Sequence, residues 1–156
     1  MTARTIERPG RGTVDGSSLH PDLVRLHAAW VVALVATLGA LFVGEIMGQA
    51  PCVLCWYQRI AMFPLAILLG VAAFRGDRGV RVYALPLALA GLAIAAFHGL
   101  LYAGIVSEAI EPCGAGPSCA SADMTILGGL PLPFLSLAAF VAITLLLAPV
   151  PGKKRA

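Results

Sequence analysis

Residues 26–47 read LHAAWVVALVATLGALFVGEIM, and this long apolar stretch decides the fold. A helix rises about 1.5 Å per residue, so about 20 apolar residues cross the hydrocarbon core of a bilayer. Three further stretches are long and apolar enough to do the same, at residues 55–74, 82–104 and 127–148. The sequence therefore predicts an all-α integral membrane protein, a bundle of four membrane-spanning helices.

The composition supports lipid as the main solvent of this chain. The 156 residues are 59% hydrophobic and 12% charged, and the mean hydropathy is +0.88. A soluble domain carries about 25% charged residues and exposes much of its surface, so it could not bury this apolar area. Disorder of the whole chain is excluded because it requires few apolar residues. The net charge of +3 gives no indication of nucleic-acid binding.

Basic residues set the expected orientation. All of the eleven lysines and arginines except Arg59 lie before the first stretch, between the second and third, or after the fourth. Cytoplasmic segments of membrane proteins are enriched in lysine and arginine. We therefore expect both termini and the middle loop to be cytoplasmic, and the other two loops to face outward.

The expected organisation has three parts. Residues 1–25, rich in Gly, Arg, Thr and Ser, read as a disordered cytoplasmic tail that helps to orient the chain. Residues 26–150 form the membrane domain, and residues 151–156 a basic cytoplasmic tail. The alternative for the N-terminus is a cleaved signal peptide, which the apolar stretch disfavours because it exceeds the 7–15 residues typical of such peptides.

The chain has four cysteines, and all are expected on the outward side: Cys52, Cys55, Cys113 and Cys119. Disulfides persist outside the cytoplasm. Structural disulfides over such short loops would stabilise little, and a zinc site with four thiolate ligands would sit on an oxidising face. A CxxC at a helix start places two sulfurs together where the helix dipole lowers thiol pKa values. We favour redox pairs with no metal, and the two alternatives stay open.

Two polar residues lie inside the expected spans. Arg59 follows Cys55 by four residues, hence on the same helix face and about 6 Å deeper. An arginine in a span is costly, and here it could stabilise a Cys55 thiolate and hold a ligand carbonyl; the alternative is snorkelling to the surface. His98, about 9 Å deep, could line the same pocket or make a helix–helix hydrogen bond.

The string PCVLCWYQR at residues 51–59 resembles the signature of the disulfide bond formation protein B family, in particular its short-loop, BdbC-like branch. The resemblance covers residues 26–150. It implies a multi-pass protein of the bacterial inner membrane that reoxidises an extracytoplasmic thioredoxin-fold thiol oxidase (DsbA- or BdbD-like). It also implies a membrane quinone, ubiquinone or menaquinone, as electron acceptor, with Arg59 and His98 in the quinone site.

The same resemblance implies a role for each cysteine. Cys113 would form the mixed disulfide with the partner, with Cys119 as its companion. Cys52 would exchange with the outer-loop pair, and Cys55 would face the quinone. Only five residues separate Cys113 from Cys119, fewer than in the best-known members, which leaves the order of interchange open.

Two other functions remain as alternatives. A membrane bundle with structural outer-loop disulfides could be an accessory protein without chemistry of its own. An enzyme that sends electrons outward to reduce secreted disulfides is disfavoured, because the spans contain no further cysteines that could form a relay. The redox states of the cysteines discriminate, since structural disulfides stay oxidised when partner and oxidant are varied.

Overall fold

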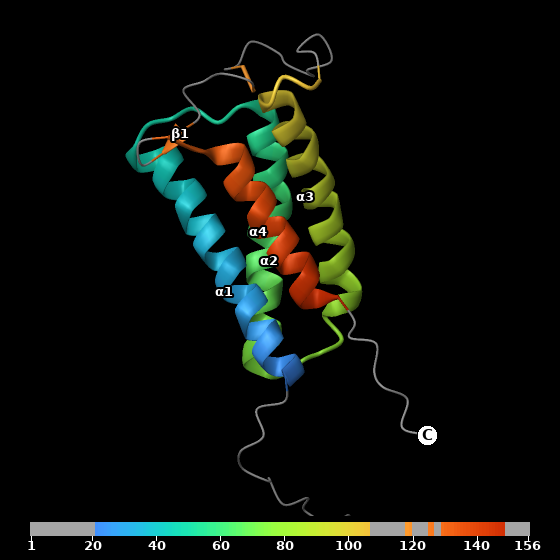
Figure 1. Cartoon of the computed structure of the whole chain (residues 1–156). Helices are drawn as coiled ribbons and strands as arrows, with labels where there is room; N and C mark the ends of the chain where they lie inside the picture. The colour runs from blue at the N-terminus through green and yellow to red at the C-terminus, as the bar shows by residue number, and fades with distance from the viewer. Residues whose placement is uncertain (1–20, 107–117, 120–124, 127–128, 149–156) are drawn as a thin grey trace, which may run out of the picture.

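The computed structural model describes residues 21–106, 118–119, 125–126 and 129–148 (Figure 1). Within that part of the chain the fold is mainly helical, as predicted. The elements in chain order are α1 (Pro21–Leu41), a π-helix η1 (Phe42–Ile46), α2 (Val53–Arg75), α3 (Arg81–Tyr102), β1 (Thr125–Ile126), β2 (Leu130–Pro131) and α4 (Leu132–Leu147). The two short strands pair antiparallel beside the start of α4.

Three helical segments in the described part are long and apolar enough to cross a membrane: Pro21–Ile46, Val53–Arg75 and Arg81–Tyr102. The fourth, α4, is apolar but has only 16 residues. Its expected start at residue 127 is wrong. Pro131 adopts an extended conformation just before the helix, and Pro133 lies in the first turn, where a missing N–H removes no helical hydrogen bond.

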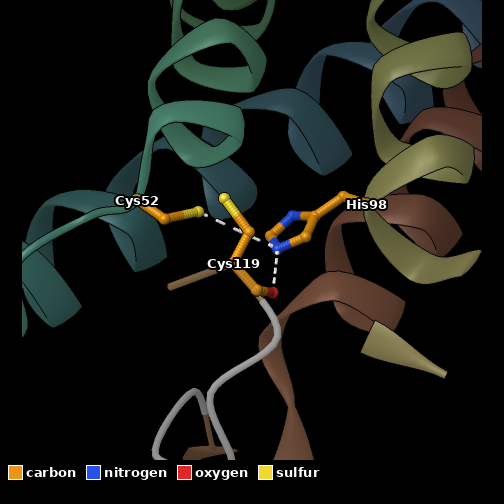
Figure 2. A group of neighbouring side chains, drawn as sticks. All are labelled: Cys52, His98 and Cys119. Carbon is orange, nitrogen blue, oxygen red and sulfur yellow. Dashed lines mark hydrogen bonds between the residues drawn. The ribbon is translucent and has the colours of Figure 1, made fainter. Parts of the chain in front are cut away.

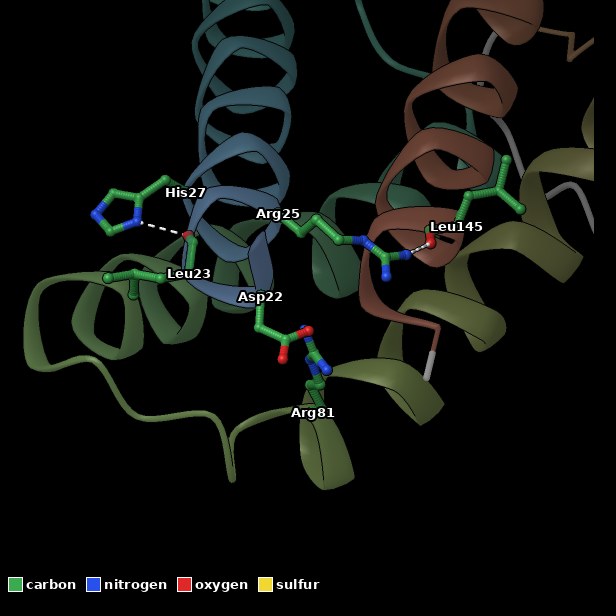
Figure 3. Close-up of polar contacts among 6 residues, drawn as sticks. All are labelled: Asp22, Leu23, Arg25, His27, Arg81 and Leu145. Atoms are coloured by element: carbon green, nitrogen blue, oxygen red, sulfur yellow. Dashed lines mark hydrogen bonds and ion pairs between the residues drawn. The ribbon is translucent and has the colours of Figure 1, made fainter. Parts of the chain in front are cut away.

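The first helix begins at Pro21, inside the stretch expected to be tail, and residues 1–20 lie outside the described part. Proline is favoured in a first helical turn, and the carboxylate of Asp22 complements the positive end of the helix dipole. Asp22 also accepts a hydrogen bond from the Nη2 of Arg81 at 3.0 Å (Figure 3). A favourable first turn and a contact to α3 therefore extend the helix beyond its apolar stretch.

Arginine side chains connect neighbouring helices at this end of the bundle through hydrogen bonds and an ion pair. Arg25 donates from Nη2 to the backbone oxygen of Leu145 on α4 at 2.7 Å, and His27 donates from Nδ1 to the oxygen of Leu23 at 2.9 Å (Figure 3). The cysteine-bearing start of α2 and the β1–β2 hairpin lie at the opposite end (Figure 1). The Asp22–Arg81 ion pair and the described cysteines thus occupy opposite ends of the molecule.

The four helices pack as a ring in which α1 contacts α2 and α4, and α3 contacts α2 and α4. Leu65, Leu69, Phe140 and Ile143 are fully buried in the centre. The face of α3 that meets the core consists of small residues, Ala84, Ala88, Gly91 and Ala95. This agrees with the close helix approach that small residues permit in membrane bundles.

Gly91 is required for the contact between α3 and α4, because a Cβ at this position would overlap the ring of Phe140. We expect Gly91→Ala to lower the free energy of unfolding by about 1–3 kcal/mol, the usual cost of overpacking a core. The matched control is Gly39→Ala, where a Cβ meets no atom within 4 Å. Thermal unfolding of the purified variants in detergent measures the difference, and equal losses in both variants would contradict this account of the packing.

Candidate active site

The CxxC sequence opens α2 and brings its two sulfurs together. Cys52 is the N-cap residue of α2, with an extended backbone (φ −70°, ψ 170°), and its Sγ accepts a hydrogen bond from the backbone N–H of Cys55 at 3.4 Å. The thiol of Cys52 in turn donates to the Sγ of Cys55 at 3.1 Å. Because residues at the cap and the third helical position lie on one side of the first turn, the spacing itself makes the pair.

The two sulfurs differ in their surroundings. Cys52 is fully buried. Its hydrogen bond to Cys55 and its burial raise the pKa of the Cys52 thiol to about 12, against smaller opposite effects of His98 and Cys119. The expectation that the helix start lowers thiol pKa values is therefore wrong for Cys52. In the reduced pair this thiol keeps its proton near neutral pH and shares it with the Cys55 sulfur.

His98 of α3 lies at the junction between the CxxC pair and the loop segment that contains Cys119. Its Nε2 is 3.2 Å from the backbone oxygen of Cys119 and 3.9 Å from the Sγ of Cys52 (Figure 2). Since a carbonyl oxygen only accepts, Nε2 carries the proton and donates. In the neutral ring Nδ1 must then accept, and the Nε2 amide nitrogen of Gln58 donates to it at 3.1 Å. The side chain of Gln58 thus selects the tautomer.

Cys119 joins this junction from the loop segment before β1. It is fully buried, and its Sγ, the Sγ of Cys52 and the Nε2 of His98 all lie within 4.8 Å of one another. Cys52 and Cys119 share a small apolar cluster with Leu54 and Leu101. The structure therefore brings together two of the cysteines that the sequence places in different loops. Cys113 lies outside the described residues.

Arg59 is held inside the bundle by the backbone of the first helical segment. Its Nη2 donates to the oxygen of Ala40 at 2.8 Å, and its guanidinium lies 5.5 Å from the ring centroid of Trp56. Ala40 immediately precedes the turn where the α-helix changes to the π-helix η1, a kind of irregularity frequent at functional sites. A Cβ on Gly44 would come within 3.0 Å of the same Nη2, so glycine leaves room for the guanidinium.

A cavity of about 820 Å³ lies beside these residues, between α1, α2 and α4. Its lining is mainly aliphatic and aromatic, and its polar side chains include Cys55, Gln58, Arg59 and His98. The size is that of a site for a drug-sized or cofactor-sized molecule. Of the residues expected from the sequence, Cys55, Arg59 and His98 line the cavity, whereas Cys52 and Cys119 meet behind it at His98.

The sequence alone assigns no role to Gln58. The available signal is an amide in an apolar span, directly between the cysteine pair and Arg59. An amide that is only 7% exposed in such a span needs a partner, because an unsatisfied buried polar group is costly. Its partner, His98, is forty residues away in sequence and could not be paired with it by spacing.

Comparison with known proteins identifies the relatives of this chain. A family model described as disulfide bond formation protein DsbB matches residues 24–150. The chain is 57% identical over 119 residues to a probable disulfide formation protein of Metapseudomonas resinovorans, covering 76% of this chain and 83% of the relative. It is 42% identical over 132 residues to disulfide bond formation protein C of Bacillus subtilis (strain 168), covering 85% and 96%.

A probable disulfide formation protein of Deinococcus radiodurans is 46% identical over 133 residues, covering 80% of this chain and 86% of the relative. No solved structure matches the chain. The family resemblance of residues 51–59 is thereby confirmed over most of the sequence. The chain belongs to the disulfide bond formation protein DsbB family, and this membership implies a membrane oxidoreductase that supports disulfide bond formation.

Proposed function

We propose that this protein reoxidises an extracytoplasmic thioredoxin-fold dithiol oxidase and passes the electrons through two cysteine pairs to a membrane quinone. One observation carries the proposal: the sulfurs of Cys119, Cys52 and Cys55 follow one another toward the apolar cavity. The Cys119 and Cys52 sulfurs lie within 4.8 Å, those of Cys52 and Cys55 lie 3.1 Å apart, and Cys55 lines the cavity. Thiol–disulfide exchange needs sulfurs that can reach one another in this way.

The first exchange takes place at Cys113. Cys119 is fully buried, so a folded partner cannot attack its sulfur directly, which favours Cys113 as the docking cysteine. A partner thiolate attacks Cys113 in the Cys113–Cys119 disulfide, and the second partner thiol then releases it. The partner leaves with a disulfide, and Cys113 and Cys119 are left as two thiols.

The second exchange moves the electrons to the CxxC pair. The Cys119 thiolate attacks Cys52 in the Cys52–Cys55 disulfide, and Cys55 leaves as thiolate. Cys113 then attacks Cys119, which restores the outer disulfide and releases Cys52. A thiol with a raised pKa is a poor leaving group, and the N–H of His98 Nε2, 3.9 Å from Cys52 Sγ, stabilises the departing thiolate. Gln58 keeps that N–H in place.

The cavity residues fit a quinone. Its apolar lining suits a ring and an isoprenoid tail, and its polar side chains suit a quinone carbonyl. Arg59 has five N–H donors, and the described contact to Ala40 uses one nitrogen, so further donors remain for a carbonyl oxygen. A bound ubiquinone or menaquinone would supply a two-electron, two-proton acceptor. Cys52 and Cys55 would return to the disulfide, with one proton from the Cys52 thiol and the other from water. Arg59 holds the Cys55 side of the pair as thiolate for this step.

A coupled assay tests the proposal. Purified protein in nanodiscs, a reduced thioredoxin-fold dithiol partner and quinone are expected to give one partner disulfide for each quinone lost, followed by quinone absorbance and thiol titration. Omission of the protein is the control. Partner disulfides formed without quinone loss would contradict the quinone as acceptor. Cysteines that stay oxidised whatever partner and quinone are supplied would favour the non-catalytic accessory protein.

We further propose that four spans cross the bacterial inner membrane, with both termini and the middle loop in the cytoplasm. The contacts of Arg25 and Arg81 lie at one end of the bundle and the described cysteines at the other, which supports this orientation under the positive-inside rule. The 16 residues of α4 rise about 24 Å, less than the hydrocarbon core of about 30 Å, so we expect the adjacent β1–β2 hairpin to complete the crossing on the outer side.

The orientation predicts opposite results for two fusions. A reporter active only outside the cytoplasm is expected to be active when fused after Gly116, in the second outer loop, and silent when fused after Arg78, in the middle loop. Colony colour and enzyme activity at matched expression give the result. The reverse pattern would place the cysteines in the reducing cytoplasm and remove the basis of the relay.

A further inference from the structure

The junction between the two cysteine pairs has the donor set of a metal site. Cys52 Sγ, Cys119 Sγ and His98 Nε2 come from the cap of α2, the second outer loop and α3, and they converge (Figure 2). All three residues are buried, with exposed fractions of 0%, 0% and 1%. This set differs from the four-thiolate zinc site that the sequence analysis disfavours, because it takes one cysteine from each pair and adds an imidazole.

The spacing is close to that of a coordinated cation. Zinc bonds of about 2.3 Å to sulfur and about 2.0 Å to nitrogen place neighbouring tetrahedral ligand atoms about 3.5–3.8 Å apart. The Cys52 Sγ and His98 Nε2 are 3.9 Å apart, and no pair in the set exceeds 4.8 Å. We propose that the reduced protein binds one thiophilic d10 cation, such as Zn²⁺, through Cys52, His98 and Cys119.

The charges and hydrogen bonds of the site suit such a complex. Two thiolates neutralise a dication, so the apolar cluster around Cys52 and Cys119 would hold no net charge. Both thiols release their protons to solvent, and His98 stays neutral with its proton moved from Nε2 to Nδ1. Gln58 then accepts from Nδ1 through its amide oxygen instead of donating through its nitrogen. Such a hydrogen bond to the other ring nitrogen orients a metal-binding histidine.

Cation binding and disulfide exchange exclude each other at this site, because both require the same two sulfurs. The oxidised protein is therefore expected to bind no cation. Under the proposed function, on which this consequence rests, a bound cation stops electron transfer from the outer pair to the CxxC pair. The binding itself does not depend on the relay.

Cobalt titration tests the site directly. The full chain, purified in nanodiscs and reduced without oxygen, is titrated with Co²⁺, whose thiolate charge-transfer and tetrahedral d–d absorbance report sulfur ligands; Zn²⁺ then displaces the Co²⁺. One equivalent is expected. Cys119→Ser and His98→Gln should each weaken binding at least tenfold, because each removes a ligand.

Three matched variants serve as controls. Cys55→Ser and Cys113→Ser each remove a cysteine outside the ligand set, and His27→Gln changes a histidine at the opposite end of the bundle. All three should bind Co²⁺ as the parent does. Binding that survives both Cys119→Ser and His98→Gln, or that is lost in Cys55→Ser, would overturn the proposed site.

A turnover measurement separates this inference from the proposed function. With the site intact, Zn²⁺ should inhibit partner oxidation reversibly, and a chelator should restore it. Co²⁺ binding in a protein that shows no turnover even without metal would refute the relay and support the site. If saturating Zn²⁺ left turnover unchanged, a bound cation would not block disulfide exchange, and this consequence would be refuted.

Discussion

Cys119→Ser is expected to reduce oxidation of the partner dithiol by about 10³-fold or more, because a nucleophile is removed rather than weakened. The variant should still reduce quinone when a small dithiol such as dithiothreitol is supplied. A small reductant can reach the Cys52–Cys55 disulfide without the outer pair, because Cys55 lines the cavity. Quinone absorbance with the two electron donors gives the comparison.

Cys55→Ser is the matched variant on the other side of the relay. It should lose quinone reduction with both donors, since Cys55 is the CxxC cysteine that lines the cavity. Both proteins should accumulate in the membrane, because neither residue belongs to the main helix core. Normal partner turnover in Cys119→Ser would make the outer pair structural and the relay wrong.

Substitution of Arg59 is expected to have the second largest effect. Arg59→Lys keeps a cation but loses the planar head, so the apparent quinone affinity should fall while part of the activity remains. Arg59→Met loses the charge as well and should reduce turnover further. A hydrogen bond to a charged group contributes about 1.5–3 kcal/mol, which corresponds to effects of about tenfold to a hundredfold.

Arg25→Met is the control for the Arg59 variants. Arg25 donates to a helix backbone oxygen at 2.7 Å, much as Arg59 does at 2.8 Å, but at the other end of the bundle. The measurement is the dependence of turnover on quinone concentration at matched membrane levels. Identical curves for Arg, Lys and Met at position 59 would mean that the arginine only extends toward the surface, and would remove Arg59 from the quinone site.

The features that the sequence predicts correctly are those set by local geometry. Hydrophobic runs of helical length locate α1, α2 and α3 because the bilayer requires about 20 apolar residues. The four-residue spacing of Cys55 and Arg59 correctly places both on one face of α2, where they line the same cavity. The late start of α4 is missed because residues 127–131 carry no charge that would end the apolar stretch, while the helix start depends on the backbone limits of Pro131.

The junction at His98 depends on contacts that no local pattern contains. Cys52 and His98 are 46 residues apart, and His98 and Cys119 are 21 apart, so helix periodicity cannot bring them together. The raised pKa of Cys52 is missed for a related reason. A helix start favours the thiolate, but burial and proton sharing with Cys55 outweigh it, and burial is a property of the assembled bundle.

The order in which the two disulfides form tests the central claim most directly. Fully reduced protein, without partner, is mixed rapidly with quinone, quenched with an alkylating reagent at increasing times and mapped by peptide mass. We expect the Cys52–Cys55 disulfide to appear first and Cys113–Cys119 to follow after a lag, because the outer pair passes its electrons to quinone only through the CxxC pair. Formation of Cys113–Cys119 before Cys52–Cys55 would contradict this claim.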